Sequence, residues 1–81
     1  MRIVREVSHP ECKITIFSWN NRYLIKLEQG FLEQTFKIDQ FDVADEIELL
    51  KITDEQFIQK ALLRFQEMSQ SLGEAKQRAE T

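Results

Sequence analysis

CKITIFSWNNRYLIKLE, at residues 12–28, predicts the central β-hairpin of the fold, because two alternating apolar runs flank two asparagines. Asparagine tolerates the positive φ angles of a two-residue hairpin loop, so Asn20 and Asn21 predict a tight turn between antiparallel strands. A two-residue loop also fixes which residues lie opposite one another. The expected pairs are Lys13–Glu28, Ile14–Leu27, Thr15–Lys26, Ile16–Ile25, Phe17–Leu24, Ser18–Tyr23 and Trp19–Arg22.

The predicted hairpin is apolar on both faces. Successive side chains of a strand point to opposite sides, so one side carries Ile14 and Ile16 with their partners and forms an ordinary core. The other side carries Phe17, Trp19 and Leu24, where a simple two-layer domain would meet water. This surplus of apolar side chains indicates that the second face has a neighbour.

Two further strands are expected beside the hairpin. Ile3, Val4 and Val7 favour a strand, and Pro10 ends it because proline lacks a backbone donor. Alternation also resumes after Gly30, which supplies the positive φ of another turn. The four strands are expected at about residues 2–7, 12–19, 22–28 and 31–38.

The second turn gives a provisional register. With Gln29 and Gly30 as the loop, Leu32 would lie opposite Leu27, and Glu33 would lie opposite Lys26. Facing opposite charges stabilise a sheet, and the first hairpin also places Lys13 opposite Glu28. The same register puts Gln34 on the core face and Arg22 opposite Lys37, which are its two weak points.

The C-terminal half of the chain predicts helix. Residues 39–52 are expected to form an acidic connector or a short helix capped by Asp42. Thr53 to Gln56 has the pattern of a capping box, which predicts a helix over residues 54–72 with one broad apolar stripe. Residues 73–81 begin with Gly73 and have little to bury, so we expect a frayed polar tail.

These elements predict one α+β domain, a four-stranded antiparallel meander with one long C-terminal helix packed across one face. At the level of topology alone, this order over residues 2–72 resembles the single-stranded-DNA-binding transcriptional coactivator and Whirly/PUR groups. Those proteins use strand faces for nucleic acid and pair through their helices. No motif of theirs was found in the sequence, so the resemblance implies no site residue.

The composition of the chain indicates the cellular environment and the kinds of partner that suit it. Its 81 residues contain one cysteine, Cys12, which excludes an intramolecular disulfide framework. There is no apolar run long enough to cross a bilayer, and the charges near Met1 do not fit a signal peptide. We therefore expect a cytoplasmic chain without membrane contact. The net charge of −3 disfavours a sequence-independent nucleic-acid binder, although residues 1–38 carry +2 and residues 39–81 carry −5.

Few side chains suit catalysis or metal binding. His9 and Cys12 are the one histidine and the one cysteine, and an extended segment would hold them about 10 Å apart at ~3.3 Å per residue, unless the turn at Pro10 folds them together. Zinc usually takes four ligands, and no second cysteine–histidine pair exists. We expect a protein that is not an enzyme and holds no cofactor or metal.

Three interpretations of the second sheet face remain. In the first, the chain self-associates as a homodimer through this face. In the second, bases of single-stranded nucleic acid stack on its aromatic side chains while cations contact phosphates. In the third, strand one, residues 39–52 or the tail folds over it. Self-association is the leading hypothesis, with binding residues Phe17, Trp19, Arg22, Leu24, Lys26 and Phe31.

Overall fold

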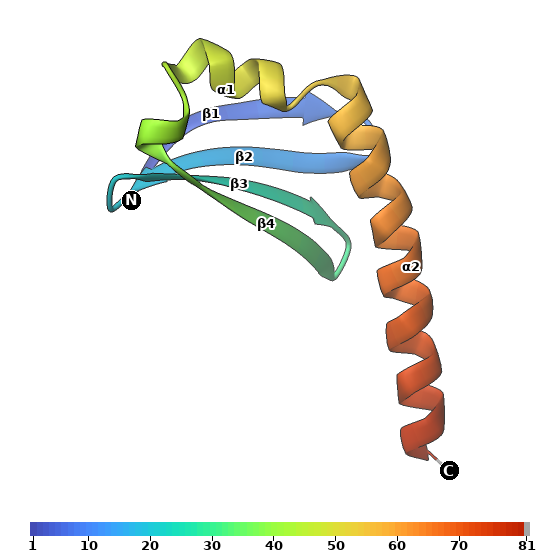
Figure 1. Cartoon of the computed structure of the whole chain (residues 1–81). Helices are drawn as coiled ribbons and strands as arrows, with labels where there is room; N and C mark the ends of the chain where they lie inside the picture. Colours follow the sequence, from blue (N-terminus) through green and yellow to red (C-terminus); the bar gives the residue numbers. More distant parts are fainter. Residues whose placement is uncertain (81) are drawn as a thin grey trace.

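A computed structural model describes residues 1–80 and confirms the α+β architecture. Four antiparallel strands form one sheet in the order β1-β2-β3-β4, and the helices follow in the C-terminal half (Figure 1). The elements are β1 (Arg2–His9), β2 (Cys12–Trp19), β3 (Arg22–Gln29), β4 (Leu32–Asp39), the 3₁₀ helix η1 (Gln40–Asp42), α1 (Glu46–Ile52) and α2 (Glu55–Glu80).

The first predicted hairpin is confirmed. Asn20 and Asn21 have φ angles of 53° and 61°, the left-handed pair that a type I′ turn requires. Every expected partner of the β2–β3 pair is found, from Lys13 opposite Glu28 to Trp19 opposite Arg22. The turn chemistry alone therefore fixes the faces of the two central strands.

The register predicted for the second hairpin is wrong by two residues. Leu27 lies opposite Gln34, because the loop consists of Gly30 and Phe31 instead of Gln29 and Gly30. Gly30 has a φ of 59° and takes the first loop position, as in a type II′ turn. A shift of two residues leaves every side chain on its predicted face.

The new register removes one weak point and explains the other. Arg22 faces Asp39 instead of a lysine. Gln34 does lie on the core face, where its amide donates to the Ala61 carbonyl at 2.8 Å and accepts from Arg64 Nε at 2.9 Å.

Strand β1 is longer than predicted and contains a bulge. It runs to His9, and Pro10 and Glu11 form the turn that leads to β2. The register shifts between Ile3 and Arg5, so that Ile3 lies opposite Phe17. An extra residue in one strand shifts the alternation of its faces.

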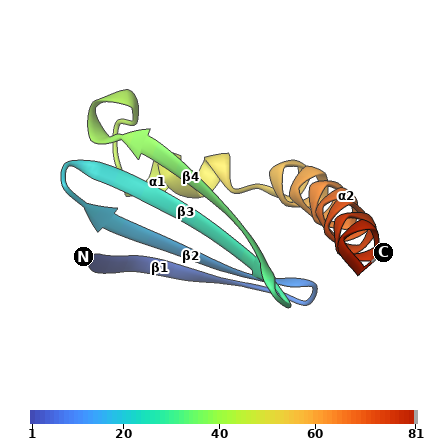
Figure 2. The same ribbon diagram turned by 90° about the horizontal axis from the view of Figure 1, so that it is seen from below.

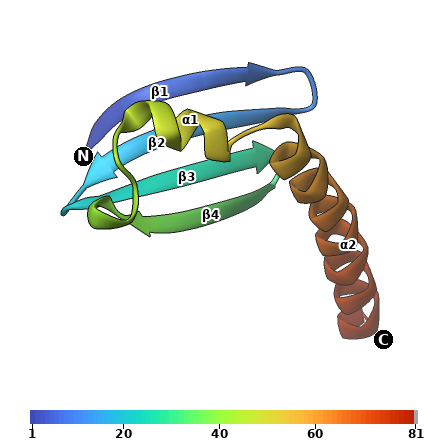
Figure 3. The ribbon, with the colours of Figure 1, turned by 45° about the horizontal axis from the view of Figure 1, so that its top comes forward.

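One face of the sheet, the inner face, forms the core. Its central side chains Ile14, Ile16, Ile25 and Leu27 are fully buried. Both α1 and α2 pack on this side, as Figures 2 and 3 show from opposite tilts. The helices contribute the buried side chains Leu49, Ile58, Ala61, Leu62 and Phe65.

The helix caps differ from the prediction by a few residues. Asp45, not Asp42, caps α1 by accepting from the Glu48 amide at 2.9 Å. Asp54 accepts from the Phe57 amide at 2.9 Å, so the capping box expected at Thr53 is not the start of α2. The Thr53 hydroxyl instead donates to the Leu50 carbonyl at 3.1 Å and closes α1.

Helix α2 continues to Glu80, so residues 73–80 of the predicted tail are helical; Thr81 lies outside the described residues. Gly73 does not end the helix, because the residues after it are strong helix formers. The helix crosses the end of the sheet and extends beyond β4 (Figures 1 and 3).

Candidate functional site

The outer face of the sheet, opposite the helices, brings together four apolar side chains. Cross-strand partners share a face, so the pairs Ile3–Phe17 and Phe17–Leu24 place these three side chains in one row. Trp19 lies on the same face of β2, two residues beyond Phe17. We call these four residues the Trp19 patch.

The Trp19 patch is accessible. Trp19 is 50% exposed and Ile3 is 55% exposed, while Phe17 and Leu24 are half-buried. Within residues 1–80, both helices lie on the inner side of the sheet and β1 is one of its strands (Figure 2). The third interpretation, that another segment of the chain covers this face, is therefore wrong for the part of the chain that the structure describes.

Two of the other predicted binding residues lie on the same face, and one does not. Arg22 is the cross-strand partner of Trp19, and Lys26 lies further along β3. Phe31 is fully exposed, but it belongs to the β3–β4 turn at the opposite end of the strands. The structure therefore removes Phe31 from the patch.

Ile3 is a patch residue that the sequence did not reveal. Unbroken alternation from the Pro10 turn would place Ile3 opposite Ser18 on the inner face. The bulge between Ile3 and Arg5 moves it opposite Phe17. No residue type in Arg2–Arg5 marks this bulge, so alternation alone could not predict it.

Charges of both signs surround the patch. Lys26 lies 3.3 Å from the Glu33 carboxylate and 4.0 Å from that of Glu28. By register, the cations on the outer face number four and the anions also number four, so its formal charge is zero. They are Lys13, Arg22, Lys26 and Lys37 with Glu6, Glu28, Glu33 and Asp39.

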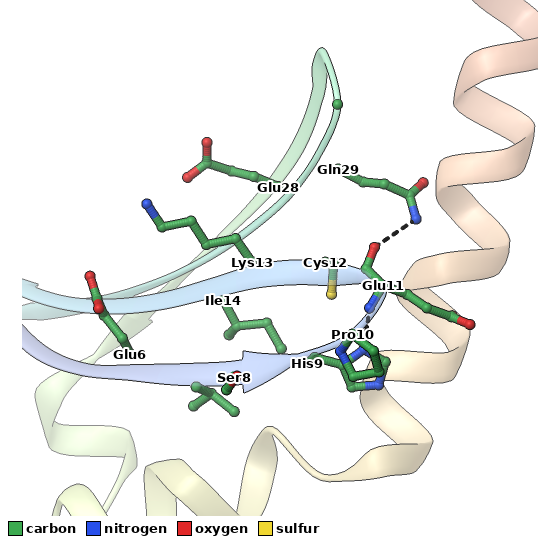
Figure 4. Close-up of a pocket in the computed structure, with 12 residues that line it drawn as sticks. Glu6, Ser8, His9, Pro10, Glu11, Cys12, Lys13, Ile14, Glu28 and Gln29 are labelled. Carbon is green, nitrogen blue, oxygen red and sulfur yellow. Dashed lines mark hydrogen bonds between the residues drawn. The ribbon is translucent and has the colours of Figure 1, made fainter.

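The second candidate is the open hollow around the β1–β2 turn (Figure 4). The turn does fold His9 and Cys12 together, because they are cross-strand partners. However, His9 Nδ1 accepts from the Glu11 amide at 3.1 Å, and its Nε2 lies 3.4 Å from a Glu55 carboxylate oxygen. Both ring nitrogens are therefore engaged away from the sulfur.

Electrostatics make this hollow a poor nucleophilic site. Burial raises the pKa of the Cys12 thiol, and the neighbouring Glu11 and Glu55 carboxylates add to the rise. A reactive cysteine needs the reverse shift, because the thiolate is the nucleophile. The pKa of Glu55 is lowered by hydrogen bonds from Gln59 and then from His9, so this carboxyl group is suited to structural pairing more than to proton transfer near neutral pH.

Residues 1–80 contain no group of three or more histidine, cysteine or acidic side chains that could hold a metal ion. None of the helices described within residues 1–80 has the length and apolarity needed to cross a bilayer.

No protein-family model matches the chain, and no curated protein or solved structure matches it either. The Trp19 patch is therefore the surface of the described chain that best fits a binding role.

Proposed function

We propose that this chain is a small, non-enzymatic interaction module of the cytoplasm that self-associates as a homodimer through the Trp19 patch. One observation carries the proposal. Trp19 and Ile3 are 50% and 55% exposed at one end of a sheet face that no helix within residues 1–80 covers. Exposed clusters of large apolar side chains commonly mark interaction sites.

The charge balance of the outer face favours an identical partner. Two copies of one face repel each other when that face carries a net charge, but here cations and anions are equal in number. The like-charged neighbours Glu28 and Glu33 both contact Lys26, at 4.0 Å and 3.3 Å. The same balance disfavours a polyanion, because nucleic-acid binding depends on an excess of cations against phosphates. Lys26, for example, already pairs with Glu33 at 3.3 Å.

The energetics favour an association that depends on concentration. Fully burying a large apolar side chain stabilises by about 1.5–3 kcal/mol, and the patch residues are already partly buried. Two patches together therefore gain on the order of 5–10 kcal/mol. This gain lies in the same range as the cost of association, about 4–15 kcal/mol.

Sedimentation velocity of matched variants tests the proposal. Leu24→Ser removes an apolar side chain from the patch and keeps Trp19 as a probe. This variant should sediment with a lower average mass than the wild type. Phe31→Ser is the control, because it removes a fully exposed phenylalanine from the opposite end of the sheet and should leave the mass unchanged. Equal masses for the wild type and Leu24→Ser across the micromolar range would refute the proposal.

A titration with a short single-stranded oligonucleotide separates the nucleic-acid interpretation. We expect no change in Trp19 emission at low salt, because the outer face has no excess of positive charge. Salt-dependent quenching that Trp19→Ala and Arg22→Ala abolish would instead support stacking of bases on this face.

A further inference from the structure

The edge of the sheet at β4 is a second unpaired surface, separate from the Trp19 patch. β4 is the last strand in the order, and no strand within residues 1–80 pairs with the edge that faces away from β3. It is eight residues long with no register shift against β3 and no proline. The other edge, β1, is interrupted by its bulge, which is a common protection against edge pairing. β4 therefore presents the better template for another strand.

The loop geometry shows which backbone groups of β4 are unpaired. In a two-residue hairpin, the residues that flank the loop exchange their hydrogen bonds, and such pairs then alternate along the ladder. Gln29 and Leu32 flank the loop, so the backbone groups of Glu33, Thr35 and Lys37 point away from β3. An added strand must pair with these residues.

One antiparallel register makes β4 complementary to itself. When Thr35 lies opposite Thr35 of a second copy, Glu33 lies opposite the partner's Lys37, and Lys37 opposite the partner's Glu33. A shift of two residues one way places Glu33 opposite the partner's Asp39, which is repulsive. A shift the other way places Glu33 opposite the partner's Thr35, and both charge pairs are lost. Lys37 is exposed and makes no ion pair within the described chain, so its ammonium group can pair with the partner's Glu33.

Helix α2 provides a surface above the added strand. The helix starts near β1, where Glu55 lies 3.4 Å from His9, and passes β4 before its C-terminal half extends beyond the edge (Figure 3). An apolar groove lies there between Leu32 on β4 and Met68 and Leu72 on α2. Leu72 is 50% exposed, so this part of the helix has no cover of its own.

The same register supplies an occupant for this groove. With Thr35 at the centre, the partner's Ile38 lies opposite Leu32 on the inner face. That is the side on which Met68 and Leu72 stand above the edge. Ile38 is partly buried against the core of its own chain, and in this register its remaining apolar surface would border the groove of the first copy.

We propose that β4 pairs antiparallel with β4 of a second copy around Thr35, and that the overhanging half of α2 covers the end of the added strand that lies beside Leu32. The pairing joins two sheets into one eight-stranded sheet and does not depend on the Trp19 patch. Since one surface is an edge and the other a face, both can be occupied at once, and the assembly closes at four chains where the two two-fold axes intersect at right angles.

Charge reversal tests the pairing. Lys37→Glu places two carboxylates opposite each other at each end of the pair, and Glu33→Lys places two ammonium groups there. Each single variant should weaken the edge interaction at least tenfold. An equimolar mixture of the two variants should restore it, because every facing pair is then again of opposite charge. The mixture also controls for the loss of the Lys26–Glu33 contact in Glu33→Lys.

Sedimentation in the Leu24→Ser background separates this interface from the Trp19 patch. We expect Leu24→Ser alone to form dimers through β4, Leu24→Ser with Lys37→Glu to be monomeric, and the mixture of the two charge variants in this background to dimerise. Unchanged masses after both charge reversals, or a mixture that stays monomeric, would overturn the edge pairing. Loss of mass in the charge variants but not in Leu24→Ser would instead overturn the patch.

Discussion

Replacing Phe65 by alanine measures how much the packing of α2 against the inner face of the sheet contributes to the free energy of unfolding. Phe65 is fully buried where α2 packs on the sheet. Truncating a buried phenylalanine costs about 3–5 kcal/mol, through lost burial and the cavity that remains. At about 0.05–0.15 kcal/mol per residue, a chain of 81 residues has roughly 4–12 kcal/mol of stability in all. Phe65→Ala should therefore remove a quarter or more of it.

Thermal unfolding followed by far-UV circular dichroism, at one low chain concentration, gives the comparison. A loss of 3 kcal/mol lowers Tm by at least about 12 °C in a domain of this size. Leu63→Ala is the matched control, because Leu63 lies on the same helix but is 60% exposed, and it should change stability by less than about 0.5 kcal/mol. If Phe65→Ala and Leu63→Ala lower the Tm by similar amounts, α2 does not have one buried and one exposed face.

Three other predictions address the turns, the helix end and the pH dependence. Gly73→Ala should raise helicity and stabilise the C-terminal half of α2 by up to about 1 kcal/mol, since the added Cβ meets no atom within 4 Å apart from its chain neighbours and the nearby backbone of its own helix; unchanged circular dichroism at 222 nm would contradict a helix that continues to Glu80. Asn21→Gly should be tolerated, while Asn21→Ala should cost about 1 kcal/mol in urea unfolding because of the φ of 61°, and equal stabilities would argue against the type I′ turn. Glu55→Gln should destabilise at neutral pH. Because the folded pKa of Glu55 is lowered, its contribution is present above the ordinary value of about 4.3 and disappears as pH falls through the folded value, so a difference that persists in strong acid would count against this contact.

The sequence was most informative where local chemistry allows one solution. Two consecutive residues with positive φ suit asparagine, so Asn20 and Asn21 determined the central register and thereby the outer face. At the second turn, Gly30 could stand first or second in the loop. The pair Lys26–Glu33 did not decide between these positions, because long side chains also meet diagonally, as their 3.3 Å contact shows.

Three features depended on contacts that no local pattern encodes. Thr53 and Asp54 are both good caps, and Thr53 serves the end of α1 instead of the start of α2. The bulge that turns Ile3 to the outer face has no marker in its residue types. The overhang of α2 beyond β4 follows from the direction in which the helix crosses the sheet, which only the three-dimensional structure gives.

Acrylamide quenching of Trp19 as a function of chain concentration tests whether the Trp19 patch is buried when the chain self-associates. The chain has one tryptophan, which lies in the patch and is 50% exposed in the isolated chain. If the patch is the self-association surface, the quenching constant should fall as the concentration rises from nanomolar to high micromolar, and Leu24→Ser should abolish the fall. A quenching constant that stays at the value of a half-exposed indole over the whole concentration range would contradict self-association through the Trp19 patch.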